Sequence, residues 1–599
     1  MNASGSNAVL SFLLALGAAG IACSPAPLAP GPPAASSGAS PDAAPPPAPV
    51  ARRVQVQVLA INDLHGNLEL PSGSNGVVLA APGDPLAGAV GARPTDAGVT
   101  LVPAGGAAYL AALITQLRAA NPFTVVVSAG DLTGASPLVS ELFRDEPTIL
   151  VMNRMGLGLE AVGNHDFDRG IPELMRLQRP GCSLGDCDAG AFPGASFEYL
   201  AANVIDTRTG RTLLPPYAIR ELGGARVAFI GETLRQTASV TRASAVAELS
   251  FLDEATAANA LVPELQRQGA SAIVLLLHQG GKQSPGGTYD GCEGFSGDLL
   301  PILDRLSPAI QVVVSAHTHE AYDCTIGGRL VTSAASYGRL VTQIELTLDP
   351  VAHALVDLRA RNVPVTHDRA PDQEVARLVK EYADRTRGVT ARVVGYVKSD
   401  LTGNAEAARS PSCETPLGDV IADAMRESSG ADVAFMNAGG IRADLVAKHP
   451  GRADFAVSYG DAFSVQPFGN TLVTMTLRGA QIQALLEQQF GSRQEPRVLQ
   501  VSRGLSYRYS YDRATKRGVV SALRLAGRPV DPTRPYSVTV PEFLASGGDG
   551  FTVLREGSDL RQGASDLDAL VTYLGKASSA TAPLAPAKGS RIQGDGCCP

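Results

Sequence analysis

The chain of 599 residues is too long for one hydrophobic core, and 18% of its residues are charged, with a formal net charge of −8. This balance argues against a dedicated nucleic-acid-binding protein, which would carry a basic face. An anionic substrate must therefore be attracted locally, by metal ions and a few arginines, rather than by the field of the whole protein.

The N-terminus has the pattern of a targeting segment. Residues 9–22 are small and apolar and end at Cys23, and this run is too short to span a bilayer as a mature helix. The pattern predicts a signal peptide over residues 1–23. Ala22-Cys23-Ser24 is similar to a bacterial lipoprotein cleavage site. Lipidation of Cys23, which would tether the chain to a membrane, and plain secretion are both open.

Residues 24–53 are dominated by Pro, Ala, Ser and Gly, which predicts a disordered tether that buries no core. The chain contains eight cysteines, as expected for export to an oxidising compartment. Sequence alone leaves their connectivity open. Reasonable pairs are Cys182 with Cys187 and Cys292 with Cys324, whereas Cys413 has no evident partner and Cys597 and Cys598 have no assignable role.

The next part of the chain alternates strands and helices. Apolar runs predict strands, and longer segments between them predict helices; the strands are 54–60, 124–128, 272–277 and 310–315, and the helices include 107–118 and 255–268. This alternation predicts an α/β sandwich, which we place at residues 54–368. Residues 71–103 are rich in Gly, Pro and Ala and are predicted to be a loop insertion.

A charged, helix-prone segment, 372–387, lies in a predicted linking helix at 369–391 and could act as a hinge. A second α/β domain is predicted at 392–577, with helices at 417–428 and 478–489 and a strand at 433–437. Residues 578–599 are predicted to be a tail.

Polar clusters stand at the C-terminal ends of the apolar strands of the first domain. In α/β sheets, ligands bind beyond these strand ends, so the clusters should converge on one face. Five of the eight histidines of the chain belong to them, and His353, His367 and His449 receive no role. The clusters are Asp63 and His65, Gly130-Asp131, Asn164 and His165, His278, and His317 and His319.

The residue types in these clusters indicate a metal centre. Mixed oxygen and nitrogen ligands suit Zn²⁺, Mn²⁺, Fe²⁺ or Co²⁺ better than Ca²⁺. Asp131 has two carboxylate oxygens and can bridge two cations. Two metals roughly 3.5–4 Å apart form a known clamp for in-line displacement at phosphorus, in which a metal-bound water attacks.

At these residues the chain resembles a known family. Asp63-x-His65, Gly130-Asp131, Gly163-Asn164-His165-Asp166 and His317-x-His319 resemble the calcineurin-like metallophosphoesterase signature. Within that superfamily the chain is similar to the 5′-nucleotidase family, which includes periplasmic UDP-sugar hydrolases and ecto-5′-nucleotidases. Ala316 departs from the usual glycine before the first histidine. The resemblance implies a four-layer α/β/β/α metallophosphoesterase sandwich followed by an α/β nucleotidase domain.

The resemblance also implies a ligand set for two divalent metal ions. One ion would be held by Asp63, His65, Asp131 and His319, and the other by Asp131, Asn164, His278 and His317.

His165 and Asp168 are the predicted catalytic pair. His165 is expected to donate to a phosphoryl or leaving-group oxygen, because Asn164 next to it is already a ligand and adjacent side chains diverge. Asp168 would orient the imidazole, as the resemblance also implies, although it could instead be the N-cap of the following helix. Asp166 could support the ligands or simply stand in a turn.

The second domain is predicted to bind the nucleoside. Arginines can donate to phosphate or ribose oxygens, two Phe rings can sandwich a base, and glycines permit close approach. The motifs resemble the C-terminal domain of the 5′-nucleotidase family, although the spacing from Arg409 to Glu414 varies among relatives. The predicted substrate-binding residues are Arg409, Asn437, Gly439, Arg442, Phe468, Phe543 and Asp549.

The sequence thus predicts an exported enzyme that hydrolyses nucleotide phosphate esters, with a nucleotide as its small-molecule partner, no nucleic-acid partner and an undetermined oligomeric state. The same site could serve a 2′,3′-cyclic-nucleotide phosphodiesterase or a UDP-sugar hydrolase. A surface nucleotide-binding protein without turnover is the alternative from another class.

Overall fold

The computed structural model describes residues 53–95, 98–181, 192–284, 286–403, 410–448, 453, 455–491, 496–512, 514–585 and 590–594. The predictions made for the signal peptide, Cys23, Cys182, Cys187, Arg409, Cys597 and Cys598 lie outside these residues.

Two mixed sheets form the centre of the N-terminal domain. The first has the strand order β18 (Ala354–Pro364), β17 (Leu340–Asp349), β1 (Val54–Ile61), β5 (Thr124–Ser128), β6 (Leu159–Ala161) and β7 (Glu198–Leu200). The second has the order β10 (Tyr217–Leu222), β11 (Ala225–Thr233), β13 (Ala272–His278), β14 (Ile310–Ser315), β16 (Arg329–Ala334) and β15 (Ala321–Ile326). The neighbours β1, β5 and β6 run parallel, as do β11, β13 and β14.

Side chains that alternate along these strands build three apolar layers. Val58 of β1 packs between the two sheets with Phe229 and Val274 of the second sheet. Leu59, its neighbour in sequence, points to the opposite face, where it packs with Leu110 of α1.

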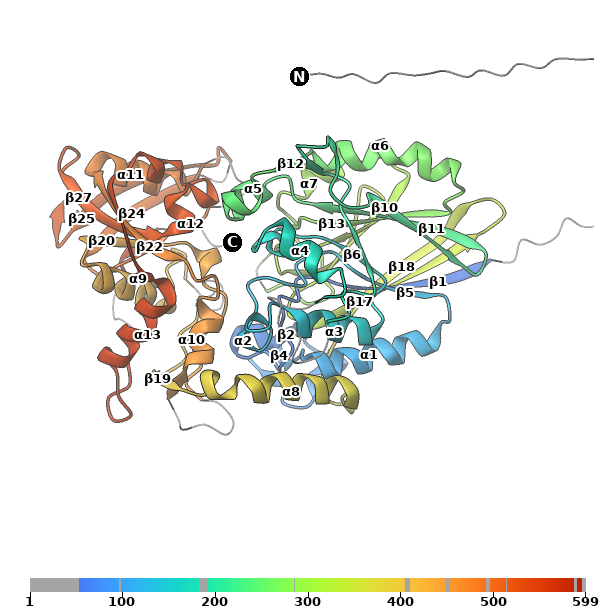
Figure 1. Cartoon of the computed structure of the whole chain (residues 1–599), viewed down its shortest axis with the longest axis horizontal. Coiled ribbons are helices and arrows are strands. Elements are labelled where there is room, and N and C mark those ends of the chain that lie inside the picture. Colours follow the sequence, from blue (N-terminus) through green and yellow to red (C-terminus); the bar gives the residue numbers. More distant parts are fainter. Residues whose placement is uncertain are drawn as a thin grey trace, which may run out of the picture. The chain divides into compact units, whose positions relative to one another are not determined.

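Helices cover the outer face of each sheet. The first sheet carries α1 (Ala107–Ala120), α2 (Leu138–Glu141), α3 (Glu146–Met155), α4 (Ile171–Leu177) and α8 (Gln373–Thr390). The second carries α6 (Glu254–Arg267) and α7 (Leu300–Leu303). Figure 1 shows α1, α3 and α8 along one side of the sandwich and α6 along the other. The predicted four-layer sandwich is confirmed.

The C-terminal domain also combines sheets with helices. One sheet has the order β23 (Gln500–Val501), β20 (Val433–Met436), β27 (Pro535–Pro541), β22 (Thr471–Arg478) and β28 (Ser558–Ser565). Another contains β26 (Arg528–Pro529), β25 (Arg517–Leu525), β24 (Leu505–Asp512) and β29 (Ile592–Gln593), and β19 (Val393–Tyr396) pairs with β21 (Ala456–Ser458). The helices are α9 (Pro416–Ser429), α10 (Tyr459–Val465), α11 (Gly479–Gln488), α12 (Glu542–Ala545) and α13 (Asp566–Ala577).

Two segments differ from the sequence expectations. The insertion at 71–103, predicted as a loop, contains a small sheet of β2 (Val77–Ala80), β4 (Thr100–Pro103) and β3 (Arg93–Pro94). The apolar residues of this sheet alternate along its strands, and two of them, Val78 and Val102, are buried against the rest of the N-terminal domain. Residues 590–594, placed in a predicted tail, add β29 to the C-terminal domain and bury Ile592 completely.

A further small sheet consists of β12 (Leu249–Phe251), β8 (Val204–Asp206) and β9 (Arg211–Thr212). The short helix α5 (Thr237–Val240) lies between β9 and β12 in the chain. Cys292 and Cys324 form the predicted disulfide. Cys413, to which the sequence assigned no partner, is also disulfide-bonded.

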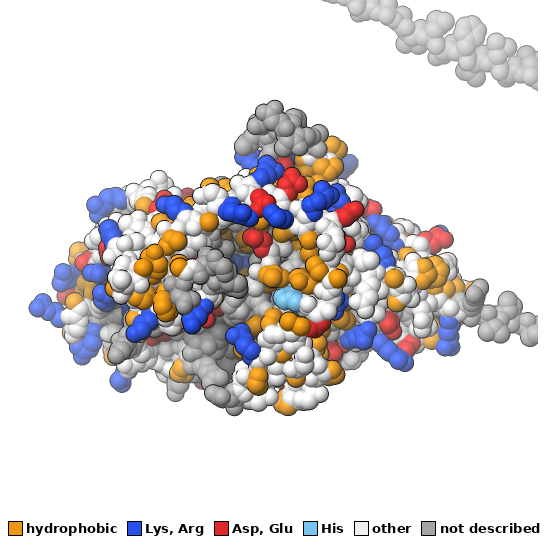
Figure 2. Space-filling model, turned by 90° about the horizontal axis from the view of Figure 1, so that it is seen from below, with side chains coloured by type: hydrophobic (Ala, Val, Ile, Leu, Met, Phe, Trp, Pro, Cys, Tyr) orange, Lys and Arg blue, Asp and Glu red, His pale blue; other side chains and the backbone are white. Residues whose placement is uncertain are grey.

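Lys and Arg side chains are interspersed with Asp and Glu over the face shown in Figure 2. Within the described ranges, the helices are all too short or too polar to cross a membrane.

Candidate dimetal centre and substrate cavity

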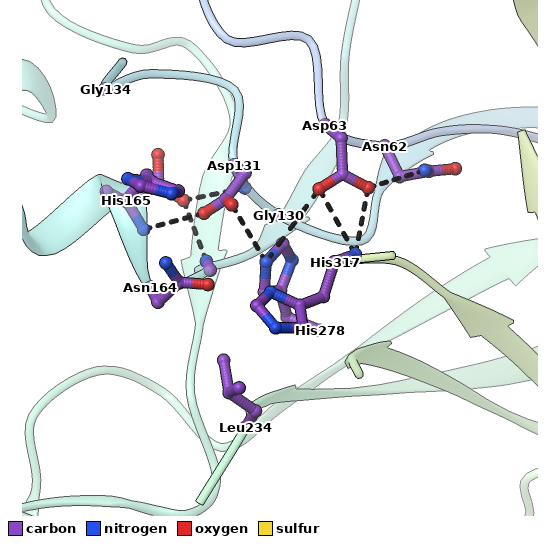
Figure 3. A network of polar contacts seen from close by, with 12 residues as sticks. Asn62, Asp63, Gly130, Asp131, Gly134, Asn164, His165, Leu234, His278 and His317 are labelled. Carbon is purple, nitrogen blue, oxygen red and sulfur yellow. Dashed lines mark hydrogen bonds and ion pairs between the residues drawn. The ribbon is translucent and has the colours of Figure 1, made fainter. Parts of the chain in front are cut away.

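The predicted ligands meet where parallel strands of both sheets end. Asp63 follows β1, Asp131 follows β5 and Asn164 follows β6 in the first sheet. In the second sheet His278 is the last residue of β13, and His317 comes two residues after β14. The clusters therefore converge, as the sequence predicted, where the C-terminal ends of the parallel strands of both sheets come together (Figure 3).

The ligand atoms form two groups of three. Asp63, His65 and His319 make one group, in which each ligand atom lies within 4.8 Å of the others. Asp131, His278 and His317 make the second group, under the same limit.

Asp131 stands between the two groups. Its Oδ2 is 3.0 Å from His278 Nε2 and 3.6 Å from His65 Nε2. Its Oδ1 accepts a hydrogen bond of 2.8 Å from the backbone N–H of His165. One carboxylate therefore touches both ligand groups, which is the geometry that a bridging ligand requires.

The backbone at the ligands is strained. Asp63, His65, Asp131, His317 and His319 all have positive φ, between 48° and 72°. This left-handed region is costly for residues with a Cβ, and such strain concentrates where side chains must be aimed at a functional point.

Hydrogen bonds fix the tautomers of two histidines. The Nδ1–H of His65 donates to the carbonyl of Gly134 at 2.9 Å, and the Nδ1–H of His278 donates to the carbonyl of Ala129 at 2.8 Å. A carbonyl can only accept, so Nδ1 carries a proton in both rings and Nε2 is the nitrogen that faces the centre. Asn62 also supports the centre, because its side-chain amide donates a hydrogen bond to Asp63 Oδ2 at 2.7 Å.

A buried polar atom indicates that the residues fit metal ions. Asn164 Oδ1 is fully buried and accepts no hydrogen bond from any described residue. Leaving such an atom without a partner is costly in a protein interior. Figure 3 shows Asn164 beside His165, with its oxygen on the side that faces His278. Mixed carboxylate, amide and imidazole donors of this kind suit divalent transition-metal ions.

The carboxylates of the two ligand groups favour a positive charge near His278. Burial alone would lower the pKa of His278, but the Asp131 carboxylate outweighs it and raises the pKa to about 9. Burial lowers the pKa values of His65, His317 and His319, so these rings are neutral and able to act as ligands. The three neutral imidazoles and the ionised Asp131 carboxylate are suitable donors to divalent cations, which would take the place of the proton that Asp131 favours on His278.

The predicted catalytic pair is formed. His165 Nδ1 and Asp168 Oδ2 are 2.9 Å apart, and both side chains are mostly buried. Burial would lower the pKa of His165, but Asp168 and Asp131 outweigh it and raise the pKa above its usual value. Asp168 is not the N-cap of the following helix, because α4 begins at Ile171 with Gly170 as its N-cap.

Asp166 supports the ligand loops. Its carboxylate accepts hydrogen bonds from the backbone N–H groups of Asp131 and Gly163, at 3.0 and 2.8 Å, and from the hydroxyl of Thr133 at 2.7 Å. Of the two roles left open by the sequence, the structure places it as a support that joins the loops after β5 and β6.

A cavity of about 610 Å³ extends from the metal ligands into the C-terminal domain. Asn164, His165, Asp168 and His317 line it from the N-terminal side. Every described substrate residue predicted from the sequence lines it from the other side; these are Asn437, Gly439, Arg442, Phe468, Phe543 and Asp549.

The contacts of these residues place two of them at the dimetal centre. Arg442 Nη2 is 3.2 Å from His65 Nε2. The ring of Phe468 stacks on that of His165, with centroids 5.5 Å apart and an interplanar angle of 20°. Asn437 Nδ2 donates to Asp549 Oδ2 at 2.8 Å, which aligns two polar groups of the cavity wall.

Sequence reasoning missed two arginines of the cavity. Arg497 pairs with Asp549, and its charge contributes to the lowered pKa of His317. Arg242 donates to the carbonyl of Phe468 at 2.6 Å and so holds the loop that carries that ring. Both arginines stand alone in the sequence, outside any motif with a recognisable spacing.

Comparison with known proteins agrees with this geometry. The family model of the calcineurin-like phosphoesterases matches residues 56–321, and that of the 5′-nucleotidase C-terminal domain matches residues 393–556. The two models cover the dimetal centre and the opposite wall of the cavity. The chain belongs to the 5′-nucleotidase family of metallophosphoesterases.

Relatives of this 5′-nucleotidase family member cover both domains. Endonuclease YhcR of Bacillus subtilis is 29% identical over 551 residues, which are 90% of this chain but only 41% of YhcR. A 5′-nucleotidase of Vibrio parahaemolyticus is 25% identical, covering 77% of this chain and 82% of the relative. The crystal structure of a 5′-nucleotidase precursor from Thermus thermophilus superimposes with a TM-score of 0.71 at 27% identity, covering 90% of this chain and 99% of that one.

Proposed function

We propose that the protein hydrolyses phosphate esters of nucleotides, with a nucleoside 5′-monophosphate as the type substrate. The observation that carries this proposal is a single cavity with metal-ligand groups at one end and Asn437, Phe468, Phe543 and Asp549 at the other. A phosphoesterase without nucleoside specificity would have no need of the second wall.

Two divalent metal ions fit the ligand groups. Asp63, His65 and His319 would hold one, His278, Asn164 and His317 the other, and Asp131 would reach both. When bound, such ions activate water and neutralise charge on a phosphoryl group.

The protein's own groups divide the remaining work. His165 is held by Asp168 so that its Nε2 is free to give a proton to the leaving-group oxygen. Arg442 places a guanidinium beside His65, where it can donate hydrogen bonds to the negatively charged phosphoryl oxygens. Phe468 and Phe543 offer aromatic faces to a base, and Asp549 offers an acceptor to ribose hydroxyls.

A nucleoside diphosphate sugar is the second candidate substrate. Arg497 adds a cation to the cavity beside Asp549, and its charge acts on His317. A second phosphate in the leaving group would give this arginine a partner other than Asp549. The pairing of His165 with Asp168 argues against a nucleotide-binding protein without turnover, because binding alone needs no such dyad.

We also propose that the protein acts outside the cytoplasm. The apolar run before Cys23 and the disulfide between Cys292 and Cys324 support export to an oxidising compartment. Fractionation of the producing cells, with and without the first 23 residues, tests this.

Substrate choice is tested on the purified full chain supplied with Mn²⁺ or Zn²⁺. AMP, UDP-glucose, 2′,3′-cyclic AMP and p-nitrophenyl phosphate are compared by kcat/KM, with products separated by chromatography. We expect AMP to exceed p-nitrophenyl phosphate by at least about tenfold, the effect of roughly 1.4 kcal/mol of nucleoside binding. Equal values for both substrates would mean that the second wall of the cavity does not recognise nucleosides.

A further inference from the structure

A turn of the insertion at 71–103, η1 (Gly73–Gly76), meets the C-terminal domain. The backbone N–H and the hydroxyl of Ser74 both donate to Asp444 Oδ2, at 3.0 and 2.7 Å. Gly73 has φ of +63°, and a Cβ on it would lie 2.9 Å from the same oxygen. The turn is therefore shaped to let the Asp444 carboxylate approach closely.

The second oxygen of Asp444 is tied to the C-terminal domain itself. Its Oδ1 accepts hydrogen bonds from the Thr402 hydroxyl at 2.8 Å and from the Gly403 N–H at 3.0 Å. Four donors from two distant parts of the chain thus hold one half-buried carboxylate. Charge-assisted hydrogen bonds of this kind are the strong ones, and their number fixes the side chain in one position.

Arg442, two residues before Asp444, is held by the same contact. Its carbonyl accepts from Asn75 Nδ2 at 2.9 Å, and its N–H donates to the carbonyl of Val465 at 2.9 Å. The peptide of Arg442 is therefore fixed between the insertion and the end of α10. From this anchored backbone the side chain reaches His65, with 3.2 Å between Nη2 and Nε2.

We propose that Asp444 is a positioning residue, which uses Ser74 and Asn75 of the insertion to hold Arg442 against the dimetal centre. We call this set of contacts the Asp444 latch. The proposal rests on the proposed function, because Arg442 matters to turnover only if a phosphoryl group binds beside His65. Displacement of a binding group by about 1 Å is enough to lower the rate on the order of a hundredfold. Contacts that fix the backbone of Arg442 can therefore affect turnover.

The insertion offers a matched control. On another side it is anchored by the Tyr289 hydroxyl, which donates to Asp84 Oδ2 at 2.9 Å. That hydrogen bond lies within the N-terminal domain and touches neither Arg442 nor Asp444. If the insertion were only a surface decoration, losing either anchor would have the same effect on turnover.

The test compares Ser74→Ala/Asn75→Ala with Tyr289→Phe in the full chain loaded with metal. We expect the double variant to lower kcat/KM by about tenfold, the value of one to two lost hydrogen bonds, for AMP and p-nitrophenyl phosphate alike. Both substrates should suffer because Arg442 serves the phosphoryl end. Tyr289→Phe should stay within about twofold of wild type, and Ser74→Thr, which keeps the hydroxyl, should retain activity.

Two further measurements separate the latch from a general structural effect. In an Arg442→Ala background the Ser74→Ala/Asn75→Ala change should cost nothing more, because the latch acts through Arg442. A loss that persists in that background would overturn the proposal. Hydrogen–deuterium exchange at residues 437–445 should rise in the double variant and not in Tyr289→Phe, and unchanged exchange would equally overturn it.

The exchange measurement does not depend on turnover. If the wild-type chain hydrolyses no nucleotide and the exchange difference is still found, the proposed function fails while the latch stands.

Discussion

Replacing Asp168 with Asn tests the catalytic pair most sharply. The substitution keeps the size of the side chain but removes the negative charge that lies 2.9 Å from His165 Nδ1. A hydrogen bond to a charged group contributes about 1.5–3 kcal/mol. If that contribution is made mainly in the transition state, kcat should fall by roughly 10- to 150-fold.

The KM for AMP should change little, because the nucleoside contacts lie on the opposite wall of the cavity. Metal content should equal that of wild type, since Asp168 belongs to neither ligand group. Steady-state AMP hydrolysis and elemental analysis of the same sample measure both. The matched control is Asp253→Asn. Asp253 stands at the start of α6 and its carboxylate pairs with Arg305, so its loss should leave kcat unchanged.

An unchanged kcat in Asp168→Asn would refute the orienting role. A fall in kcat accompanied by loss of metal would show instead that Asp168 supports the ligands.

Three other predictions concern the cavity, the metal centre and the C-terminus. Replacing Phe468 and Phe543 together with Ala should raise the KM for AMP by about tenfold or more, the loss of stacking on one base, while sparing p-nitrophenyl phosphate; an equal loss on both substrates would exclude a base clamp. His278→Ala should lower the bound metal by one ion per chain and abolish AMP turnover, and full metal content with activity would contradict the ligand assignment. Arg591→Ala should lower the free energy of unfolding by about 1.5–3 kcal/mol, because it removes charge-assisted hydrogen bonds to the Asp423 carboxylate, which keeps only those from Arg503 among the described residues; a denaturant midpoint equal to that of wild type would show that the pair is not structural.

The convergence of the two candidate metal-ligand groups could be predicted from sequence because its signal is local. Each ligand lies at or within a few residues of the end of an apolar run, as Asp63 does after 54–61, and parallel strands bring such ends together whatever the loops between them do. The contact between the two residues of the proposed catalytic pair was equally accessible, since His165 and Asp168 are three residues apart on one turn.

Contacts between distant parts of the chain were not accessible in this way. Asp444 lies 370 residues from Ser74, and neither residue belongs to a motif. Arg591 was assigned to a tail because residues 578–599 are rich in Pro and Ala, but its side chain is mostly buried and pairs with Asp423. Arg497 enters the cavity only because the fold brings it to Asp549. Sequence periodicity reports which face of an element is apolar, and it is silent on such pairings.

The most direct test of the account is a metal titration of the metal-free full chain with Mn²⁺ or Zn²⁺, in which AMP turnover and bound metal are measured on the same samples. The two ligand groups joined by Asp131 predict that turnover rises with occupancy and reaches its maximum at two ions per chain. Full AMP turnover with one ion, or with none, would contradict the dimetal centre on which the proposed function depends.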